Sequence, residues 1–436
     1  MTTPKKSPRV GIIGLGFIGL PLALSYARQG AQVIGVDVDQ GLINAINKGK
    51  TPLQESFAGQ TIESILQDQM AAGRFRATTS YEEAAERVDH YMVTVGLPVI
   101  AGRPSLDPLL AASRSLGQVL KEGDLVILRS TVVPKTTEER IRPVLEETSG
   151  LSAAGDFDLA YCSERIAEGR AFQEFVEMPL AVGGIRAEST ERAAELLAFV
   201  TQADIHRSTI LTVETAKILE NLQRDINIAL AQEFAQVADG LGIDTYELIR
   251  IANTHHRVNL LNPGPGVGGY CLPYALHYLL PAARACNIPM PLSELARSIN
   301  DQTPRRIVDR LETLLDRAGY PLAKSKVAVL GLAMKDHSSD DRESPALKII
   351  EELEAREATV NAYDPLVPDQ YPTRVSTLEA CTREAHALVI AANQSIFEAI
   401  DWNAVWSAMK PRGVVVDTRH LLAPDDIPDG MTAWFI

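Results

Sequence analysis

The stretch Val10-Gly11-Ile12-Ile13-Gly14-Leu15-Gly16-Phe17-Ile18-Gly19 joins a short apolar run to a glycine-rich turn. The following residues, Leu20–Arg28, suit a helix, and Asp37 ends the next apolar run, about 20 residues after the turn. In such a pattern the first glycine allows a tight turn, the second lets a pyrophosphate approach, and the third lets the helix pack closely on the strand. The Asp37 carboxylate would accept hydrogen bonds from ribose hydroxyls and repel a 2′-phosphate. The stretch therefore predicts a Rossmann-type dinucleotide site that prefers NAD to NADP.

The hydrophobic pattern changes twice along the chain. Apolar runs alternate with helical stretches from Val10 to about Val200, which predicts a doubly wound parallel sheet. From Leu211 to Ala252 apolar residues recur at spacings of three and four, which predicts a long helix with one buried face. A second α/β unit begins near Lys324. We therefore expect an α/β protein with two Rossmann-like domains joined by a central helical dimerisation domain. The predicted domains are 1–205, 206–305 and 306–436.

Composition limits the function classes. The net charge of −14 argues against nucleic-acid binding. No apolar run reaches the roughly 18 residues of a membrane span, and the polar N-terminus leads straight into a strand, so we expect neither a membrane anchor nor a signal peptide. The cysteines lack paired spacing, which is typical of free thiols in a reducing cytoplasm, and no histidine has the partners of a metal site. The four cysteines are Cys162, Cys271, Cys286 and Cys381.

One cysteine has an unusual context. Cys271 comes directly after the glycine-rich segment Gly264–Gly269. Glycines let the backbone approach a ligand closely, so a thiol in this place can meet a bound substrate. A nicotinamide site combined with such a thiol suggests oxidation through a thiohemiacetal and a thioester. The other three cysteines are expected to be small buried residues.

Several motifs occur in the order found in one known family. They are Ser130–Val132, Glu164–Gly169, Glu214–Asn221, the cysteine segment, Lys335–Pro345, and Arg419 within Asp417–Arg419. With these motifs the chain resembles the nucleotide-sugar 6-dehydrogenases (the UDP-glucose and GDP-mannose dehydrogenase family) over essentially its whole length. The segment Arg257–Gly269 looks most like the branch that oxidises UDP-N-acetylhexosamines such as UDP-ManNAc and UDP-GlcNAc.

The resemblance implies an NAD-dependent oxidation of a sugar C6 alcohol to a uronic acid, by two hydride transfers, with Cys271 as nucleophile. It implies that Lys217 and Asn221, four residues apart on the long helix, stabilise an oxyanion, and that Glu164 and Thr131 position a water molecule. It also implies a homodimer or larger homo-oligomer in which Arg257 reaches the neighbouring site. The implied cofactor contacts are Gly14, Gly16, Phe17, Ile18, Gly19, Asp37, Val95, Gly96, Ser130, Thr131, Glu168 and Arg342. The implied substrate contacts are Glu164, Arg165, Ile166, Ala167, Lys217, Asn221, Arg257, Gly266, Val267, Gly268, Lys335 and Arg419.

The chain departs from the family pattern beside the cysteine. The family usually has an aspartate four residues after it, often preceded by a lysine, where this chain has Ala275 and Tyr274. Leu97 and Ser163 also replace a usual threonine and proline. Three alternatives stay open: a UDP-glucose 6-dehydrogenase, a two-electron hydroxyacid dehydrogenase that needs no cysteine, and a catalytically impaired homologue that binds NAD and a nucleotide sugar, which Ala275 favours.

Overall fold

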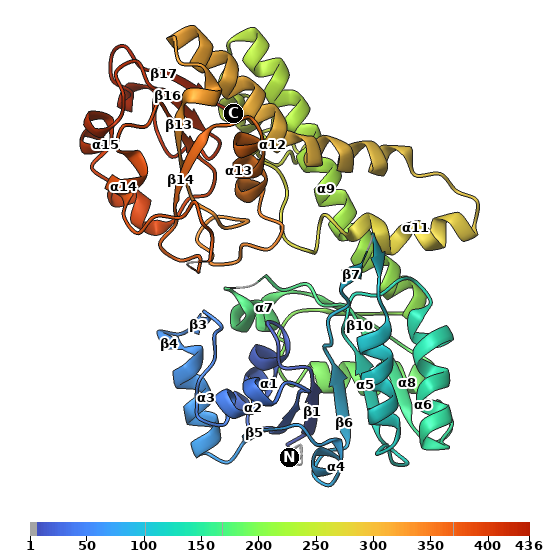
Figure 1. The fold of residues 1–436 in the computed structure, drawn as a ribbon. Helices are drawn as coiled ribbons and strands as arrows, with labels where there is room; N and C mark the ends of the chain where they lie inside the picture. Colours follow the sequence, from blue (N-terminus) through green and yellow to red (C-terminus); the bar gives the residue numbers. More distant parts are fainter. Residues whose placement is uncertain (1–6, 101, 168, 369) are drawn as a thin grey trace. The chain divides into compact units, whose positions relative to one another are not determined.

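The computed structural model describes residues 7–436 except 101, 168 and 369. The chain divides into two compact units (Figure 1). The N-terminal unit comprises residues up to Leu219 together with His277–Ile288, and the C-terminal unit comprises Glu220–Leu276 and Pro289–Ile436. The predicted division into three domains stays a prediction.

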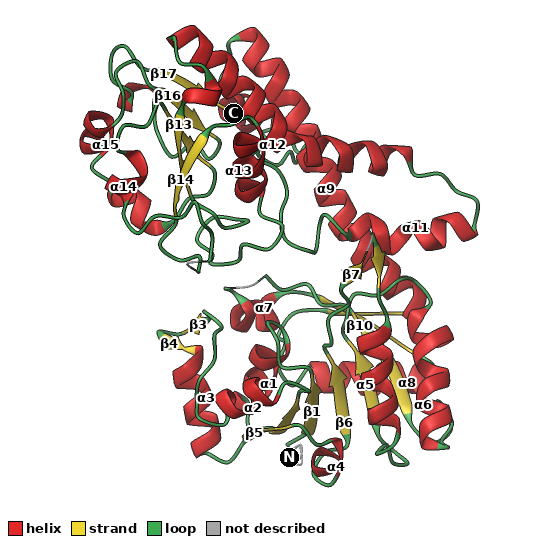
Figure 2. Ribbon diagram, in the orientation of Figure 1, coloured by secondary structure: helices red, strands yellow, loops and turns green. Residues whose placement is uncertain are grey.

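The described part of the N-terminal unit contains an eight-stranded sheet with the order β12-β11-β10-β9-β6-β1-β2-β5 (Figure 2). Its neighbouring strands pair in parallel, except that β10 and β11 are antiparallel, so the predicted parallel sheet is mixed near this edge. The strands are β1 (Arg9–Ile13), β2 (Gln32–Val36), β5 (Phe75–Thr78), β6 (His90–Val93), β9 (Leu125–Leu128), β10 (Asp158–Cys162), β11 (Leu180–Gly184) and β12 (Ile205–Ser208). Two small hairpins are β3 (Ser56–Phe57) with β4 (Gln60–Thr61), and β7 (Val99–Ile100) with β8 (Arg103–Pro104).

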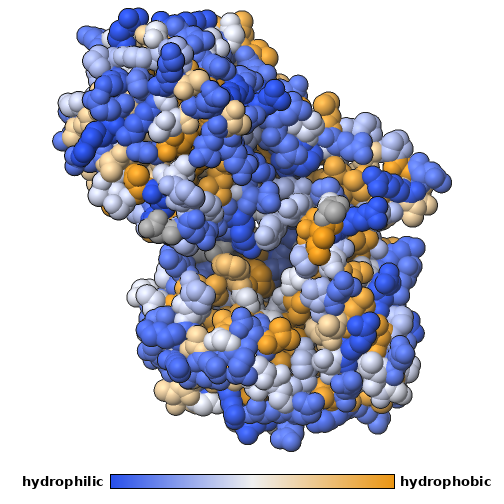
Figure 3. Space-filling view, viewed as in Figure 1, coloured by the Kyte–Doolittle hydropathy of each residue, from blue (hydrophilic) through white to orange (hydrophobic). Residues whose placement is uncertain are grey.

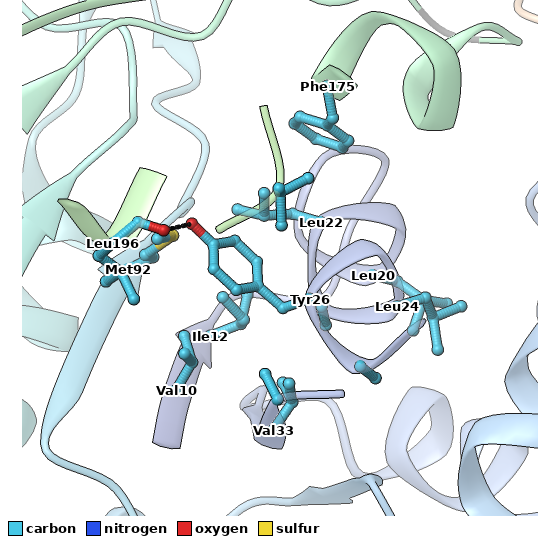
Figure 4. Close-up of a cluster of buried hydrophobic side chains, with 14 of the residues drawn as sticks. Val10, Ile12, Leu20, Leu22, Leu24, Tyr26, Val33, Met92, Phe175 and Leu196 are labelled. Carbon is cyan, nitrogen blue, oxygen red and sulfur yellow. Dashed lines mark hydrogen bonds between the residues drawn. The ribbon is translucent and has the colours of Figure 1, made fainter. Parts of the chain in front are cut away.

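Helices cover both faces of this sheet. They are α1 (Gly19–Arg28), α2 (Gln40–Ile46), α3 (Ile62–Ala71), α4 (Tyr81–Ala85), α5 (Asp107–Gly117), α6 (Arg142–Ser149), α7 (Ala171–Glu177) and α8 (Ala187–Leu197), with a π-helical turn at Thr137–Ile141. Consecutive residues of β1 enter opposite cores: Ile12 packs with α1 and Ile13 packs with α5. In the first core the Tyr26 hydroxyl donates a 3.0 Å hydrogen bond to the Leu196 carbonyl (Figure 4). The sheet is therefore doubly wound, as the alternating pattern predicted.

A buried carboxyl in this unit makes stability depend on pH. Asp124 is 3% exposed, and burial raises the pKa of its carboxyl from 3.8 to about 6. Between these values the native state binds more protons than the unfolded chain, so this contribution to stability is lost as the pH rises through the window. We expect Asp124→Asn to raise the free energy of unfolding at pH 7.5 by up to about 3 kcal/mol and to change it little at pH 4. Thermal unfolding at both pH values measures this effect.

The control is Glu122→Gln, which removes the same charge from an exposed neighbour. An equal gain in both variants would assign the effect to net charge and contradict the burial argument.

The described part of the C-terminal unit contains a five-stranded parallel sheet with the order β14-β13-β15-β16-β17. The strands are β13 (Lys326–Leu330), β14 (Thr359–Tyr363), β15 (Ala387–Ile390), β16 (Val414–Asp417) and β17 (Thr432–Phe435), and the helices around them are α13 (Pro345–Ala355), α14 (Leu378–Thr382) and α15 (Trp402–Ala408). Val329 and Leu330 enter different cores, so this sheet is also covered on both faces.

Helices, two of them long, make up most of the middle of the chain. They are α9 (Ile210–Leu241), α10 (Thr245–Ala252), α11 (Ala275–Ala285) and α12 (Pro291–Ala318). The sequence predicted one helix from Leu211 to Ala252, but α9 ends before Gly242, which has φ +69°, and the Asp244 side chain caps α10 at the Glu247 N–H, 2.7 Å away. A left-handed glycine and a new N-cap outweigh the continuing apolar periodicity.

Hydrophilic residues cover most of the face of each unit seen in Figure 3, with apolar residues between them. None of the described helices combines the length and the apolarity needed to cross a lipid bilayer.

Candidate active site

The glycine-rich turn between β1 and α1 has the geometry that its sequence predicted. Gly14 has φ +93°, and its N–H donates to the Val36 carbonyl at 2.7 Å. A Cβ on Gly19 would lie 1.7 Å from the Gly14 oxygen, so only glycine fits there. Gly16 and Phe17 are exposed, and a Cβ on Gly16 would meet no protein atom within 4 Å. The turn, with Ile18 before the helix, thus leaves open space at a helix N-terminus, which fits a diphosphate.

Asp37 is fixed beside this turn. One carboxylate oxygen accepts the Leu15 N–H at 2.7 Å, and the other accepts the Asp39 N–H at 3.0 Å. The carboxylate follows β2, the strand next to β1, where a ribose that follows the diphosphate would lie. The residues present therefore fit a dinucleotide.

The other predicted cofactor residues of this unit follow neighbouring strands. Val95 and Gly96 follow β6, and Ser130 and Thr131 follow β9. The Ser130 hydroxyl donates to the Val95 carbonyl at 2.6 Å, so the two loops are joined. Because β1, β6 and β9 are adjacent and parallel, these residues share the carboxyl edge of the sheet with the glycine turn. Glu168 lies outside the described residues.

Glu164 follows β10 and is only 9% exposed. One of its carboxylate oxygens accepts the N–H groups of Arg165 and Ile166 at 2.8 and 3.0 Å. The other accepts the Arg129 guanidinium at 2.7 Å. Burial by itself would lower the pKa of Arg129, but Glu164, Cys162 and Tyr26 together raise this pKa above its usual value, with Glu164 contributing most of the three. The neighbouring Ala167 N–H is bonded to Glu174 instead, at 2.6 Å.

Sequence reasoning missed Arg129. It directly follows the buried strand β9 and is 2% exposed, so it needs an anionic partner in the folded protein. The sequence did carry a signal for this residue: a cation directly after an apolar strand indicates a buried charge that needs a partner.

Removing Arg129 would leave the Glu164 carboxylate buried without its cation. We expect Arg129→Met to lower the free energy of unfolding by about 3 kcal/mol, and Arg129→Met/Glu164→Gln to recover more than half of this loss. Denaturant unfolding of both variants measures the difference. The matched control is Arg170→Met. Arg170 is exposed and lies 3.7 Å from Glu174, whose carboxylate also accepts the Ala167 N–H, so the loss of Arg170 should cost less than about 1 kcal/mol. Equal losses at both arginines would contradict the buried pair.

The long helix α9 carries Lys217 and Asn221. Lys217 is half-buried in the N-terminal unit, and Asn221 is 5% exposed in the C-terminal unit. Glu214, one turn earlier, is fully buried and accepts the N–H groups of Lys135 and Thr137 at 2.6 and 2.9 Å. Burial raises the pKa of this carboxyl. Glu214 thus connects α9 to the segment after β9, which also contains Thr131.

Cys271 is exposed and belongs to the C-terminal unit. The Asn221 amide donates to the Cys271 carbonyl at 3.3 Å, and the Gln232 amide donates to the Gly264 carbonyl at 2.9 Å. A Cβ on Gly268 would lie 2.8 Å from the Glu343 carbonyl oxygen. We interpreted these glycines as space for a ligand, but Gly268 is required by close packing against protein.

The remaining cysteines divide into two groups. Cys162 and Cys381 are buried, and burial raises the pKa of their thiols to about 11 and about 12. Cys286 is exposed, so the prediction that it is buried was wrong; it follows the end of α11, where the chain leaves the helix.

The other predicted substrate residues of the C-terminal unit lie in loops. Lys335 follows β13 and Arg419 follows β16, both at the carboxyl edge of the parallel sheet. Arg419 pairs with Asp336, and a Cβ on Gly264 would meet its guanidinium at 2.9 Å. Val267 is buried and Gly266 half-buried in the segment before the cysteine, and Arg257 is exposed.

Arg342 also belongs to the C-terminal unit. Its guanidinium donates to the Asp340 carboxylate at 2.7 and 2.5 Å, and its central carbon lies 5.1 Å from the centre of the Tyr270 ring. Its predicted contact with the cofactor stays a prediction. Among the described residues, no three His, Cys, Asp or Glu side chains gather closely enough to hold a metal ion.

Comparisons with known proteins agree over nearly the whole chain. Three sequence models of the UDP-glucose/GDP-mannose dehydrogenase family match: the NAD binding domain at residues 8–201, the central domain at 211–302 and the UDP binding domain at 328–424. The chain is 34% identical over 414 residues to a UDP-N-acetyl-D-mannosamine dehydrogenase of Pyrococcus horikoshii, covering 95% of this chain and 96% of that protein.

It is also 32% identical over 424 residues to an NDP-N-acetyl-D-galactosaminuronic acid dehydrogenase of Ralstonia nicotianae, covering 94% and 96% of the two chains. The solved structure of the UDP-D-ManNAc dehydrogenase from Pyrococcus horikoshii superposes with a TM-score of 0.91 at 33% identity, covering 98% of this chain and 99% of that one.

Proposed function

Since the chain belongs to the UDP-glucose/GDP-mannose dehydrogenase family, we propose that it oxidises the C6 alcohol of a UDP-N-acetylhexosamine to the uronate, with UDP-N-acetylmannosamine as the first candidate. The protein is an NAD-dependent nucleotide-sugar dehydrogenase. The observation that carries the finer proposal is the exposed thiol of Cys271, in a loop held by buried Asn221, in a chain whose relatives act on N-acetylated amino sugars by name.

The proposed reaction has two oxidations and one hydrolysis. The glycine turn and Asp37 would hold NAD⁺, which would supply the hydride acceptor for both oxidations. In the first oxidation C6 would lose a hydride and the alcohol its proton, which gives an aldehyde. The Cys271 thiolate adds to this aldehyde to form a thiohemiacetal. In the second oxidation the thiohemiacetal would lose its C6 hydride and its hydroxyl proton, which gives a thioester, and water would then release the carboxylate and the thiol. One sugar nucleotide, two NAD⁺ and one water thus yield one carboxylate, two NADH and three protons.

The side chains divide this work by their chemistry. Lys217 and Asn221 would stabilise negative charge on the C6 oxygen, as donors pre-arranged on a helix do effectively. Glu164 would orient the hydrolytic water, together with the Thr131 hydroxyl. Its carboxylate is held by Arg129 and by two backbone N–H groups, so its position is fixed before substrate binds.

We further propose a homodimer in which Arg257 reaches the neighbouring site. Large exposed apolar side chains on the central helices support this proposal, because a partner subunit would cover them. They are Leu219, Val237, Leu241, Ile251, Leu292 and Leu295.

NADH formed per sugar nucleotide tests the function. Limiting UDP-ManNAc, UDP-GlcNAc, UDP-GalNAc, UDP-glucose and GDP-mannose would each be supplied with excess NAD⁺. Two NADH from UDP-ManNAc are expected. Two NADH from UDP-glucose alone would overturn the choice of sugar. One NADH per site followed by arrest, with a mass increase on Cys271, would favour the impaired homologue.

The impaired homologue is the second candidate because of Ala275. This residue is 3% exposed at the start of α11, where the family usually has an aspartate. Ala275→Asp should speed turnover only if the missing carboxylate limits the wild-type rate.

A further inference from the structure

We propose that Tyr274 and Glu343 form a positioning pair that holds the Cys271 turn in place, at the point where the family's lysine and aspartate are missing. The Tyr274 hydroxyl donates to one oxygen of the Glu343 carboxylate at 3.2 Å. The other oxygen lies 3.2 Å from the Lys348 ammonium. Tyr274 and Glu343 are 69 positions apart, so their hydrogen bond joins the cysteine turn to the segment before α13. The inference rests on the proposed role of Cys271 as nucleophile.

The backbone reinforces this contact. Glu343 has φ +51°, a left-handed conformation that costs a residue with a side chain about 1 kcal/mol or more. In this conformation its carbonyl packs against Gly268, and the carbonyl of Arg342 accepts the Gly269 N–H at 2.8 Å. Strain of this kind persists only where the surroundings hold it, and it gathers at functional sites.

Aromatic contacts also link the residues on both sides of Cys271 to the segment before α13. The rings of Tyr270 and Tyr274 stack with their centres 5.6 Å apart, and the Arg342 guanidinium lies over Tyr270. The Tyr274 N–H donates back to the Tyr270 carbonyl at 3.3 Å, which closes the turn around Cys271. The residues before and after the thiol are therefore anchored to one two-residue segment, Arg342–Glu343.

This arrangement explains how the turn stays ordered without a charged side chain at Ala275. Burial and the adjacent Glu343 carboxylate raise the pKa of Tyr274, so its hydroxyl stays a donor. A donor–carboxylate bond in place of a lysine and an aspartate fixes the direction of Cys271 but supplies no proton of its own. Tyr274 and Glu343 are thus positioning residues.

Three variants test the pair. Tyr274→Phe keeps the stacked ring and removes the hydroxyl. Glu343→Ala removes the carboxylate but keeps the Cβ, so the backbone strain is unchanged. Glu343→Gln keeps an oxygen that accepts from Tyr274, and it should rescue function. The control is Tyr320→Phe, which removes a hydroxyl bonded to the Pro411 carbonyl at 2.5 Å in the same unit.

Amide hydrogen exchange of a peptide spanning 268–276 is the first measurement, because it needs no substrate. Exchange should rise about tenfold in Tyr274→Phe and Glu343→Ala, as the loss of one hydrogen bond predicts, and stay near wild type in Glu343→Gln and Tyr320→Phe. Unchanged exchange in the first two variants would overturn the pair.

Kinetics with the sugar nucleotide that the wild type oxidises is the second measurement. In Tyr274→Phe and Glu343→Ala kcat should fall about tenfold while KM for NAD⁺ stays constant. A rise in exchange with unchanged kcat would overturn the positioning role. Absence of NADH in the wild type would instead overturn the proposed function, and the exchange result would still decide the pair.

Discussion

Replacing Cys271 by serine should lower kcat with the preferred sugar nucleotide by roughly 10³-fold or more. A serine hydroxyl ionises far less readily than a thiol, so at neutral pH it offers almost no anionic nucleophile. The first hydride transfer needs no thiol and should survive as slow NADH formation. The measurements are steady-state NADH production and the NADH yield per sugar, which should fall from two toward one.

Cys286→Ser is the matched control, because Cys286 is also exposed but lies at the end of α11. Its kcat should stay within about twofold of wild type. Full multiple turnover in Cys271→Ser would contradict the covalent route and favour a two-electron dehydrogenase.

The second large effect is expected at Lys217. Lys217→Met keeps the length of the side chain but removes its charge, so negative charge that develops on the sugar oxygen loses a cationic donor. We expect kcat to fall by about 10²–10³-fold, with KM for NAD⁺ nearly constant. The comparison is Arg224→Met, since Arg224 is an exposed cation on the same helix. Similar losses in both variants would point to the overall charge of α9 and would remove Lys217 from the chemistry.

Features that depend on neighbouring residues were predictable from the sequence. The turn from Gly14 to Gly19 and the acid at Asp37 follow from short spacings, and the structure places them together. The end of α9 at Gly242 was missed because apolar residues keep a helical spacing across it, although Gly242 and Asp244 carried the signals of a stop and a new cap.

Features that depend on distant residues were not predictable in this way. Arg129 and Glu164 are 35 positions apart and meet because β9 and β10 are neighbours in the sheet. Periodicity indicates which face of an element is buried, but it does not indicate which strand lies alongside. The interpretation of Gly268 as space for a ligand was wrong for the same reason, because the residues that crowd Gly268 come from a segment more than sixty positions later.

The two hydrogen bonds of Asp37 affect how cofactor preference can evolve. The carboxylate that is expected to reject a 2′-phosphate also holds the N–H of Leu15, which is 1% exposed. Exchanging Asp37 for a small neutral residue would leave that N–H without its acceptor, at a cost of about 1–3 kcal/mol. A lineage that moves toward NADP therefore meets a stability barrier at its first step. A first substitution at Val38, which is 88% exposed, would avoid this cost, because Val38→Arg would attract the 2′-phosphate while the turn stays intact.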